Sequence, residues 1–154
     1  MPPPQQSLRQ DCWHRSFCGA IFEIPSAAGW IESIAADLGL TERQVFAMQV
    51  CLEELMSNII RYGGDSSAPW PHIDPKNPIR ISVTVRALAD RVRMTVEDNG
   101  RPFNVAQAPV KVIDQPLDQV EPGGLGIQLI KSFASSLEYS RTESGNRVTA
   151  DFIG

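Results

Sequence analysis

The sequence predicts an α+β fold in which helices gather on one face of a mostly antiparallel, mixed sheet, that is, a two-layer α/β sandwich. Segments of alternating apolar and polar residues occur in pairs around tight turns, which favours antiparallel neighbours. Segments with apolar residues at helical spacing lie between these pairs, and each can bury one face against the sheet. The expected order along the chain is strand, helix, helix, two strands, helix, two strands.

The composition is that of one compact domain with a hydrophobic core. The chain has 154 residues, of which 42% are hydrophobic and 21% are charged. We expect a flexible tail over residues 1–14 and a single domain over residues 15–154. The 14 basic and 18 acidic residues give a net charge of -4, which disfavours direct binding of nucleic acid or of anionic membranes. No apolar run approaches the roughly 20 residues of a membrane span and no secretory signal is evident, so we expect a cytoplasmic protein.

The cysteines predict neither a disulfide framework nor a zinc site. Three thiols are an odd number without CxxC spacing, and the two histidines, His14 and His72, lie far apart in the chain. We therefore expect Cys18 and Cys51 to be small buried apolar residues, as free cysteines often are.

The first strand and the first helix are expected between residues 17 and 39. Residues 17–24 (FCGAIFEI) are mostly apolar and stop at Pro25, which predicts a strand. Ser26 is a suitable N-cap for a helix with apolar residues at helical spacing. Gly39 supplies the left-handed residue that commonly ends such a helix.

The longest predicted helix begins after Thr41 and runs to about Tyr62. Thr41 and Gln44 form a capping-box pattern, and Gly63 and Gly64 stop the helix. Two stripes of side chains run along this helix, about 100 degrees apart. The stripe expected to face the core consists of Val45, Met48, Leu52, Leu55 and Ile59. The neighbouring stripe, which becomes polar toward its end, consists of Ala47, Cys51, Glu54, Asn58 and Arg61.

The second half of the chain alternates hairpins with irregular segments. Residues 64–78 hold four of the 12 prolines and no periodicity, so we expect a surface loop there. Alternating segments on both sides of residues 89–90 predict a hairpin of two central strands, and a second hairpin turns at residues 144–146. The predicted boundaries are 79–88 and 91–97 for the first hairpin, 104–122 for an irregular segment, 123–133 for a short helix, and 137–142 and 147–153 for the second hairpin.

Glu54 and Asn58 lie one turn apart on the same edge of the long helix. A carboxylate and a carboxamide oxygen in this arrangement suit a hard cation, with Asn58 as a ligand and Glu54 acting through a bound water or as a general base. Taken alone, such a pair is more often an exposed polar edge of a helix.

Asp98 ends a strand of alternating apolar residues, and Gly100 follows two residues later. In this position an aspartate can be a fixed acceptor for an amino group, and a glycine lets a flat ring approach the backbone. Taken alone, such a segment is more often an ordinary turn.

Three glycines open the last predicted helix: Gly123, Gly124 and Gly126, with Leu125 among them. A helix start offers unpaired backbone N–H groups and a partial positive charge, which favour phosphate oxygens. The segment matches neither a P-loop, because no GK[ST] follows, nor GxGxxG, because Leu129 replaces the third glycine. Hinge glycines that bind no ligand are the alternative.

These three segments occur together in one order: ExxxN on a long helix, DxG after a strand, and GGxG at the start of a later helix. In this combination they resemble the N, G1 and G2 boxes of the GHKL (Bergerat-fold) ATPase superfamily. Within it, residues 17–153 resemble the stand-alone anti-sigma-factor serine/threonine kinases through LEELMSNIIRYG, VEDNGRPFN, GGLGIQLIKSF and the closing SGNRVTADF. The resemblance covers nearly the whole chain and implies the Bergerat ATP-binding fold.

The resemblance implies a role for each residue of the first two boxes. Asp98 is expected to accept a hydrogen bond from the adenine amino group of ATP, and Gly100 is expected to leave room for the ring. Asn58 is expected to coordinate the Mg²⁺ that bridges the phosphates, and Glu54 is expected to be the catalytic base.

The third box is expected to contact the phosphates and to hinge a lid over about residues 104–122. The contacting backbone is that of Gly123, Gly124, Leu125 and Gly126. Lys111 is the one cation in the expected lid, so a strong basic clamp on the triphosphate is not visible in the sequence.

The reaction implied is transfer of the γ-phosphoryl group of ATP to a serine or threonine of a small STAS-domain antagonist protein. A sigma factor is then the competing partner in a partner-switching module that regulates transcription, and the family also implies a homodimer through the face near the first strand. The alternatives are a nucleotide-gated anti-sigma or adaptor protein without significant kinase activity, and a scaffold that binds no nucleotide. A sensor histidine kinase fits less well, because His14 and His72 lie in an expected tail and a proline-rich loop.

Overall fold

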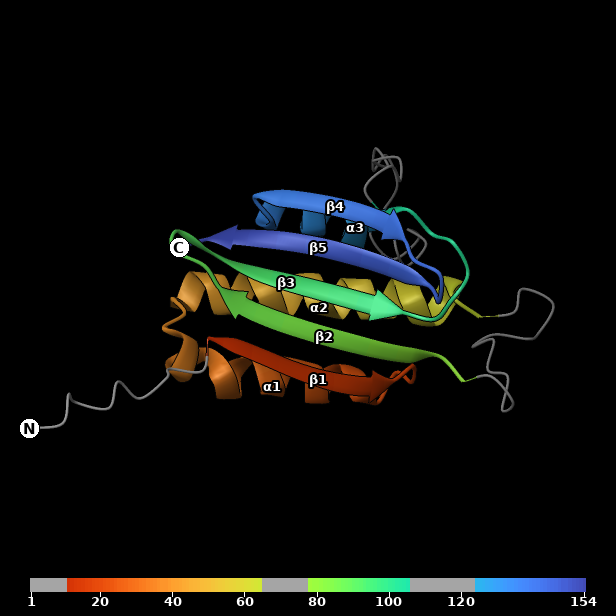
Figure 1. The fold of residues 1–154 in the computed structure, drawn as a ribbon, viewed down its shortest axis with the longest axis horizontal. Helices are drawn as coiled ribbons and strands as arrows, with labels where there is room; N and C mark the ends of the chain where they lie inside the picture. The colour runs from red at the N-terminus through yellow and green to blue at the C-terminus, as the bar shows by residue number, and fades with distance from the viewer. Residues whose placement is uncertain (1–10, 65–77, 106–123) are drawn as a thin grey trace, which may run out of the picture.

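The computed structural model describes residues 11–64, 78–105 and 124–154, which form a five-stranded sheet with three helices on one face (Figure 1). The helices are α1 (Glu23–Leu38), α2 (Glu42–Tyr62) and α3 (Gly124–Phe133). The strands are β1 (Cys12–Cys18), β2 (Arg80–Ala87), β3 (Arg91–Asp98), β4 (Ser136–Arg141) and β5 (Asn146–Ile153). Among the described helices, none combines the length and the apolar character needed to cross a bilayer.

The strands lie in the order β1-β2-β3-β5-β4, and all four pairings between them are antiparallel. β2 and β3 are therefore central strands, as the alternation of their residues predicts. The two-layer α+β architecture and the order of the elements are confirmed. Because the strands pair in fixed register, the end of β3 meets the beginning of β5 at one end of the sheet, where Asp98 is opposite Asn146.

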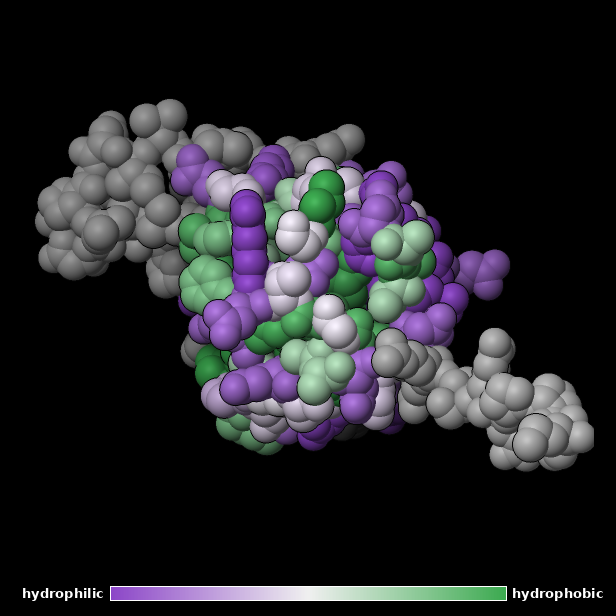
Figure 2. All heavy atoms as spheres, turned by 90° about the vertical axis from the view of Figure 1, so that its left-hand side faces the viewer, coloured by the Kyte–Doolittle hydropathy of each residue, from purple (hydrophilic) through white to green (hydrophobic). Residues whose placement is uncertain are grey.

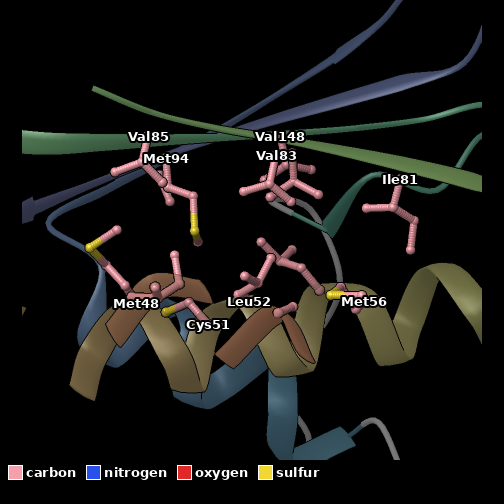
Figure 3. Packing of buried hydrophobic residues seen from close by; sticks show 14 of the residues in the cluster. Met48, Cys51, Leu52, Met56, Ile81, Val83, Val85, Met94 and Val148 are labelled. Atoms are coloured by element: carbon pink, nitrogen blue, oxygen red, sulfur yellow. The ribbon is translucent and has the colours of Figure 1, made fainter. Parts of the chain in front are cut away.

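Buried apolar side chains fill the space between the two layers. In Figure 3, Met48, Leu52 and Met56 of α2 point toward Val83 and Met94 of the sheet, and all five side chains are inaccessible to solvent. The apolar residues of β2 and β3 alternate with polar ones, so only one face of the sheet joins this core. The core fixes α2 against the central strands, and it thereby fixes whatever these elements carry at their ends.

The second stripe of α2 is also covered, because α3 packs beside it. The Cys51 Sγ atom is 3.9 Å from the carbonyl oxygen of Ile130 in α3 and donates to it. Cys51 is buried, as predicted. Burial, helped by the nearby charge of Glu54, raises the pKa of its thiol to about 12. The same prediction was wrong for Cys18, which is exposed. Alternation along β1 buries Phe17 against the helices and turns the next residue to the opposite face.

The first strand and helix begin earlier than the sequence predicts. β1 contains residues 12–14, which the sequence predicts to be part of a flexible tail, and it ends before most of the predicted strand 17–24. The helix α1 begins at Glu23, so Ser26 is not its N-cap. Pro25 lies inside the first helical turn, where backbone N–H groups have no partner within the helix and its missing N–H costs little. A short apolar run next to a proline is therefore compatible with a helix start as well as with a strand end.

The boundaries of α2 are those that the capping residues predict. Thr41 is the N-cap: its Oγ1 accepts from the backbone N–H of Gln44 at 3.1 Å, and the Gln44 side chain accepts from the Thr41 N–H at 3.0 Å. Gln44 also donates to the carbonyl oxygen of Phe152 in β5 at 3.3 Å. At the end of α1, Gly39 has a φ of 67°, the left-handed conformation expected there. These contacts orient α2 along the sheet.

Replacing Leu52 by Ala tests the packing of α2 against the sheet. Leu52 has no exposed surface, so the truncation leaves a cavity and should lower the free energy of unfolding by about 2–5 kcal/mol. Leu129→Ala in α3 is the matched control, because Leu129 is 39% exposed and its truncation should cost about 1 kcal/mol or less. Urea unfolding measures both values. Equal losses in the two variants would contradict the place of Leu52 in the core.

Candidate functional site

One end of the sandwich brings together the end of α2, the end of β3 and the beginning of β5 (Figure 1). A hollow opens there between the helix layer and the sheet. Its lining residues are Leu55, Asn58, Ile59, Gly63, Asp98, Arg101, Phe103, Val105, Asn146 and Val148. The structure thus brings two of the predicted site residues, Asn58 and Asp98, into one hollow, although they are far apart in the chain.

Asn58 is buried, with 3% of its surface exposed, and it lines this hollow. Among the described residues, neither its amide oxygen nor its amide nitrogen has a hydrogen-bond partner. A buried amide without partners is unfavourable by about 1–3 kcal/mol, and such groups are uncommon in native proteins. The two free amide atoms therefore mark a position suited to a polar ligand.

Glu54 lies one turn before Asn58 on the same stripe of α2 and is only partly exposed. It does not belong to the lining of the hollow and lies beside it. Burial, reinforced by the charge of Glu53 and opposed by that of Arg61, raises the pKa of the Glu54 carboxyl above its ordinary value. A carboxylate with a raised pKa is a better proton acceptor, so Glu54 has a property that general bases need.

Asp98 ends β3 inside the hollow, and its carboxylate is held by the protein on one side. The backbone N–H of Gly100 donates to Oδ1 at 2.8 Å, and the Asn146 side chain donates to the same oxygen at 3.0 Å. Burial raises the pKa of Asp98, while these two hydrogen bonds and the charge of Arg141 partly oppose the rise. Both hydrogen bonds from the described residues reach Oδ1, which leaves Oδ2 as the acceptor for a ligand.

Gly100 brings the backbone after β3 into contact with the end of α2. A Cβ atom at this position would lie 2.8 Å from the Cα and 2.9 Å from the carbonyl oxygen of Gly63, closer than real Cβ atoms approach. The Arg101 N–H donates to the Gly63 carbonyl oxygen at 3.0 Å and completes the contact. Glycine is thus required at position 100 because two elements meet there. The sequence predicts only that this glycine leaves room for a ring, and it does not reveal the contact with Gly63.

The β4–β5 turn supplies functional residues that sequence reasoning missed. Asn146 lines the hollow and contacts Asp98 directly, and a Cβ atom at Gly145 would overlap the carbonyl oxygen of Asp98. In the sequence, Ser144, Gly145 and Asn146 begin the closing SGNRVTADF and carry the signal of a hairpin turn, with no site role predicted for them. Nothing local indicates that this turn packs on the end of β3, because the contact depends on the pairing of β3 with β5.

The glycine-rich segment is described only in part. Gly123 lies outside the described residues, and the backbone of Gly124, Leu125 and Gly126 forms the first turn of α3. In Figure 1, α3 begins at the end of the sandwich where β3 finishes. Of the predicted lid, residues 106–122 lie outside the described part of the chain.

A second hollow lies at the opposite end of the sandwich, between the beginning of β1 and the end of α1. Figure 2 looks onto that end of the molecule, where hydrophobic and hydrophilic residues are interspersed. The lining residues are Asp11, Trp13, Ala36, Asp37, Leu38, Gly39 and Ala87. None of them is a predicted site residue, and both aspartates are exposed. The Trp13 Nε1 atom is buried without a partner among the described residues, but a lone indole N–H offers one donor only. The first hollow combines the unpartnered amide of Asn58 with the carboxyl of Asp98, whose pKa is raised, and is therefore the candidate functional site.

The chain belongs to the family of histidine kinase-like ATPase domains, whose model matches residues 23–152. BtrW of Bordetella bronchiseptica, a serine/threonine-protein kinase, is 28% identical over 120 residues, which cover 78% of each chain. RsbW of Bacillus mycoides, a serine-protein kinase, is 24% identical over 142 residues, which cover 85% of this chain and 82% of the relative. The resemblance to anti-sigma-factor kinases of the GHKL superfamily is thereby confirmed.

A solved structure has the same fold. It contains the RsbU and RsbW domains of Rv1364c from Mycobacterium tuberculosis and matches with a TM-score of 0.59 at 13% identity. The match covers 92% of this chain and 31% of that one, so the chain spans about a third of the length of the solved protein. At this identity the likeness establishes the fold alone.

The raised pKa of Asp98 predicts a pH-dependent difference in stability between the wild type and Asp98→Asn. A carboxyl group whose pKa is higher in the folded chain stabilises the fold while it is protonated, and this contribution is lost as the pH rises through the folded-state pKa. The stability of the variant relative to the wild type should therefore increase from about pH 4 to about pH 7, as measured by urea unfolding.

Asp151→Asn is the control, because the pKa of Asp151 is shifted in the opposite direction to that of Asp98. Hydrogen bonds and charges from Arg93 and Arg91 lower the pKa of Asp151, so its ionised form stabilises the fold. Most of this variant's loss of stability relative to the wild type should develop as the pH rises to about 4, and between about pH 4 and pH 7 it should show no gain. The same trend in both variants would contradict the raised pKa of Asp98.

Proposed function

We propose that this protein is an ATP-dependent serine/threonine protein kinase of a partner-switching module. It would transfer the γ-phosphoryl group of ATP to a serine or threonine of a STAS-domain antagonist, with a sigma factor as the competing partner. Family membership and the kinase names of two relatives support the proposal. The observation that carries it is the buried, unpartnered amide of Asn58 in the same hollow as the fixed carboxylate of Asp98.

The adenine end of the proposed site is at Asp98. Its Oδ1 is taken by the donors from Gly100 and Asn146, so Oδ2 is the oxygen available to accept from the exocyclic amino group of adenine. The apolar part of the lining, which includes Phe103, Val105 and Val148, suits the faces of a flat ring. A carboxylate acceptor and apolar walls together favour adenine among the bases.

The phosphate end of the proposed site is at Asn58. Among the described residues no cluster of three or more His, Cys, Asp or Glu forms a metal site of its own. The free amide oxygen of Asn58 fits Mg²⁺, which commonly takes one or two protein oxygens and completes its shell with phosphates and waters. When bound, Mg²⁺ offsets the charge on the transferred phosphoryl group. The backbone at Gly123, Gly124, Leu125 and Gly126 is proposed to contact the phosphates.

Glu54 is the proposed catalytic base. Its raised pKa suits it to accept the proton of a serine or threonine hydroxyl as that oxygen attacks the γ-phosphorus. Because Glu54 lies beside the hollow, an acceptor side chain can reach it from outside while the nucleotide occupies the interior. This arrangement suits a protein substrate that docks on the surface.

A second candidate function is a nucleotide-gated anti-sigma or adaptor protein without significant kinase activity. The sequence feature that favours it is the composition of residues 104–122, where Lys111 is the one cation available to the triphosphate. Both candidates place the protein in the cytoplasm beside a sigma factor. The exposed edge of β1 in the sheet is compatible with the homodimer that the family resemblance implies.

Replacing Glu54 by Gln separates nucleotide binding from phosphoryl transfer. The variant keeps the shape of the side chain but cannot accept a proton, so transfer should fall by about 100-fold or more while the affinity for Mg-ATP is retained. Intact-mass analysis of a STAS-domain protein incubated with Mg-ATP and the kinase measures the gain of one phosphate. In wild-type enzyme the transfer rate should also fall as the pH drops through the raised pKa of Glu54.

Glu53→Gln is the matched control, because Glu53 is the adjacent residue, is exposed, and points to another side of α2. This variant should phosphorylate at the wild-type rate. Full activity in Glu54→Gln would remove Glu54 from the mechanism. Nucleotide binding without any gain of mass in the wild type would favour the adaptor function.

Replacing Asp98 by Asn tests the adenine contact. The amide that replaces Oδ2 donates instead of accepting, so the affinity for Mg-ATP should fall about tenfold or more and the preference for ATP over GTP should disappear. A thermal melt with nucleotide reports binding, since ligand at about 100 times its Kd adds roughly 2.7 kcal/mol of stability. Asp90→Asn, in the exposed β2–β3 turn, is the control and should bind as the wild type does. Unchanged affinity in Asp98→Asn would reject the contact, and a wild type without any shift would favour a scaffold that binds no nucleotide.

A further inference from the structure

Asn146 is the centre of a buried hydrogen-bond network at the beginning of β5. It is 4% exposed, and its side chain connects β4, β5 and the segment after β3. Its Oδ1 accepts from the Tyr139 hydroxyl at 2.5 Å and from Arg141 at 3.3 Å. Its Nδ2 donates to Asp98 Oδ1 at 3.0 Å and to the Arg101 carbonyl oxygen at 2.7 Å.

The partners of Asn146 determine which way its amide points. A guanidinium can only donate and a carbonyl oxygen can only accept, so Oδ1 must face Arg141 and Nδ2 must face the carbonyl of Arg101. In that orientation Nδ2 also reaches Asp98. The amide therefore presents a donor to the Asp98 carboxylate in a fixed direction.

The network also anchors the segment that carries Asp98. Arg141 donates to the carbonyl oxygen of Gly100 at 2.7 Å, in addition to its contact with Asn146. Gly145 lies directly against the backbone of Asp98, where no larger residue fits. The ends of β4 and β5 and the turn between them thus hold the carboxylate, and a site supported by paired strands keeps its geometry more closely.

The two donors to Asp98 are therefore set before any ligand binds. With the Gly100 N–H and the Asn146 amide on Oδ1, the carboxylate cannot rotate without breaking both hydrogen bonds. Oδ2 has no donor among the described residues, and Asp98 lines the hollow, so Oδ2 is the acceptor that remains for a base. An acceptor attracts the 6-amino group of adenine and repels the 6-carbonyl oxygen of guanine, so the direction of this carboxylate decides between the two bases.

We propose that Asn146 is a positioning residue that sets the selectivity of the site for adenine nucleotides by holding Asp98 with one carboxylate oxygen toward the base. The inference rests on the proposed function, which assigns the base to Asp98. Asn146 itself touches Asp98 and need not touch the nucleotide. Its loss should therefore change the choice between bases, which a residue that merely supports the fold would not do.

Asn146→Asp is the test variant, because it keeps the shape of the side chain and replaces the donor to Asp98 by a second acceptor. The Kd for Mg-ATP should rise about tenfold or more, and the ratio of the Kd for Mg-GTP to that for Mg-ATP should fall at least about fivefold. Isothermal titration of the full chain with each nucleotide measures both quantities. The melting temperature without nucleotide reports the fold of each variant.

Asn99→Asp is the matched control. It introduces the same substitution and the same charge next to Asp98, but the Asn99 side chain contacts the Arg80 N–H and the Pro78 carbonyl oxygen instead of the carboxylate. Both the Mg-ATP affinity and the selectivity ratio should stay within about twofold of the wild type. A fall in the ratio like that of Asn146→Asp would mean that charge, and not positioning, causes the effect, and would overturn the inference.

Tyr139→Phe keeps the inference testable if Asn146→Asp does not fold. It removes one hydroxyl that donates to Asn146 Oδ1 and should lower the selectivity ratio about two- to threefold without unfolding the chain. The proposal would be overturned if a folded variant of Asn146 kept the wild-type ratio of the Kd for Mg-GTP to that for Mg-ATP. If no variant of Asn146 folds, the same ratio in Tyr139→Phe would overturn it. Equal losses of affinity for ATP and GTP would overturn it as well, because they indicate a structural role. A wild type that binds neither nucleotide would instead reject the proposed function, and the inference with it.

Discussion

The contact between the backbones of Gly63 and Gly100 is the constraint on which the candidate site depends. It joins the end of the helix that carries Asn58 to the segment that carries Asp98, and it is possible because Gly100 has no Cβ atom that would collide with the backbone of Gly63. The hydrogen bond from the Arg101 N–H to the Gly63 carbonyl oxygen fixes the junction. Core packing and strand pairing hold both elements, so they, rather than a loop, set the separation of the amide and the carboxylate.

The polar groups at this junction destabilise the fold and suit a ligand. Asn58 is buried without partners among the described residues, and burial raises the pKa of Asp98. Perturbed groups that gather in one hollow are typical of functional sites. Cys51 shows the contrast, because burial raises the pKa of its thiol too, yet it packs between helices and is not among the residues that line this hollow.

The proposed binding and transfer steps use neighbouring but different residues. Asn58 and Asp98 lie inside the hollow, while Glu54 lies beside it on the same helix stripe. A protein substrate therefore needs access only to the rim of the site, and the nucleotide can be held before the substrate arrives. Because α2 carries both Glu54 and Asn58 one turn apart, the packing of a single helix aligns the proposed base with the proposed phosphate position.

The sequence by itself determined the elements and the identity of most candidate residues. Thr41 and Gln44 predicted the beginning of α2, and alternation predicted β2 and β3 as central strands. Local patterns succeed there because caps and periodicity act within a few residues. The prediction of a strand over residues 17–24 was wrong, since the periodicity of this apolar run is compatible with both a strand end and a helix start. Only the tertiary structure decided that Asn146 holds Asp98, because that contact arises from the pairing of strands distant in the chain and leaves no local signal.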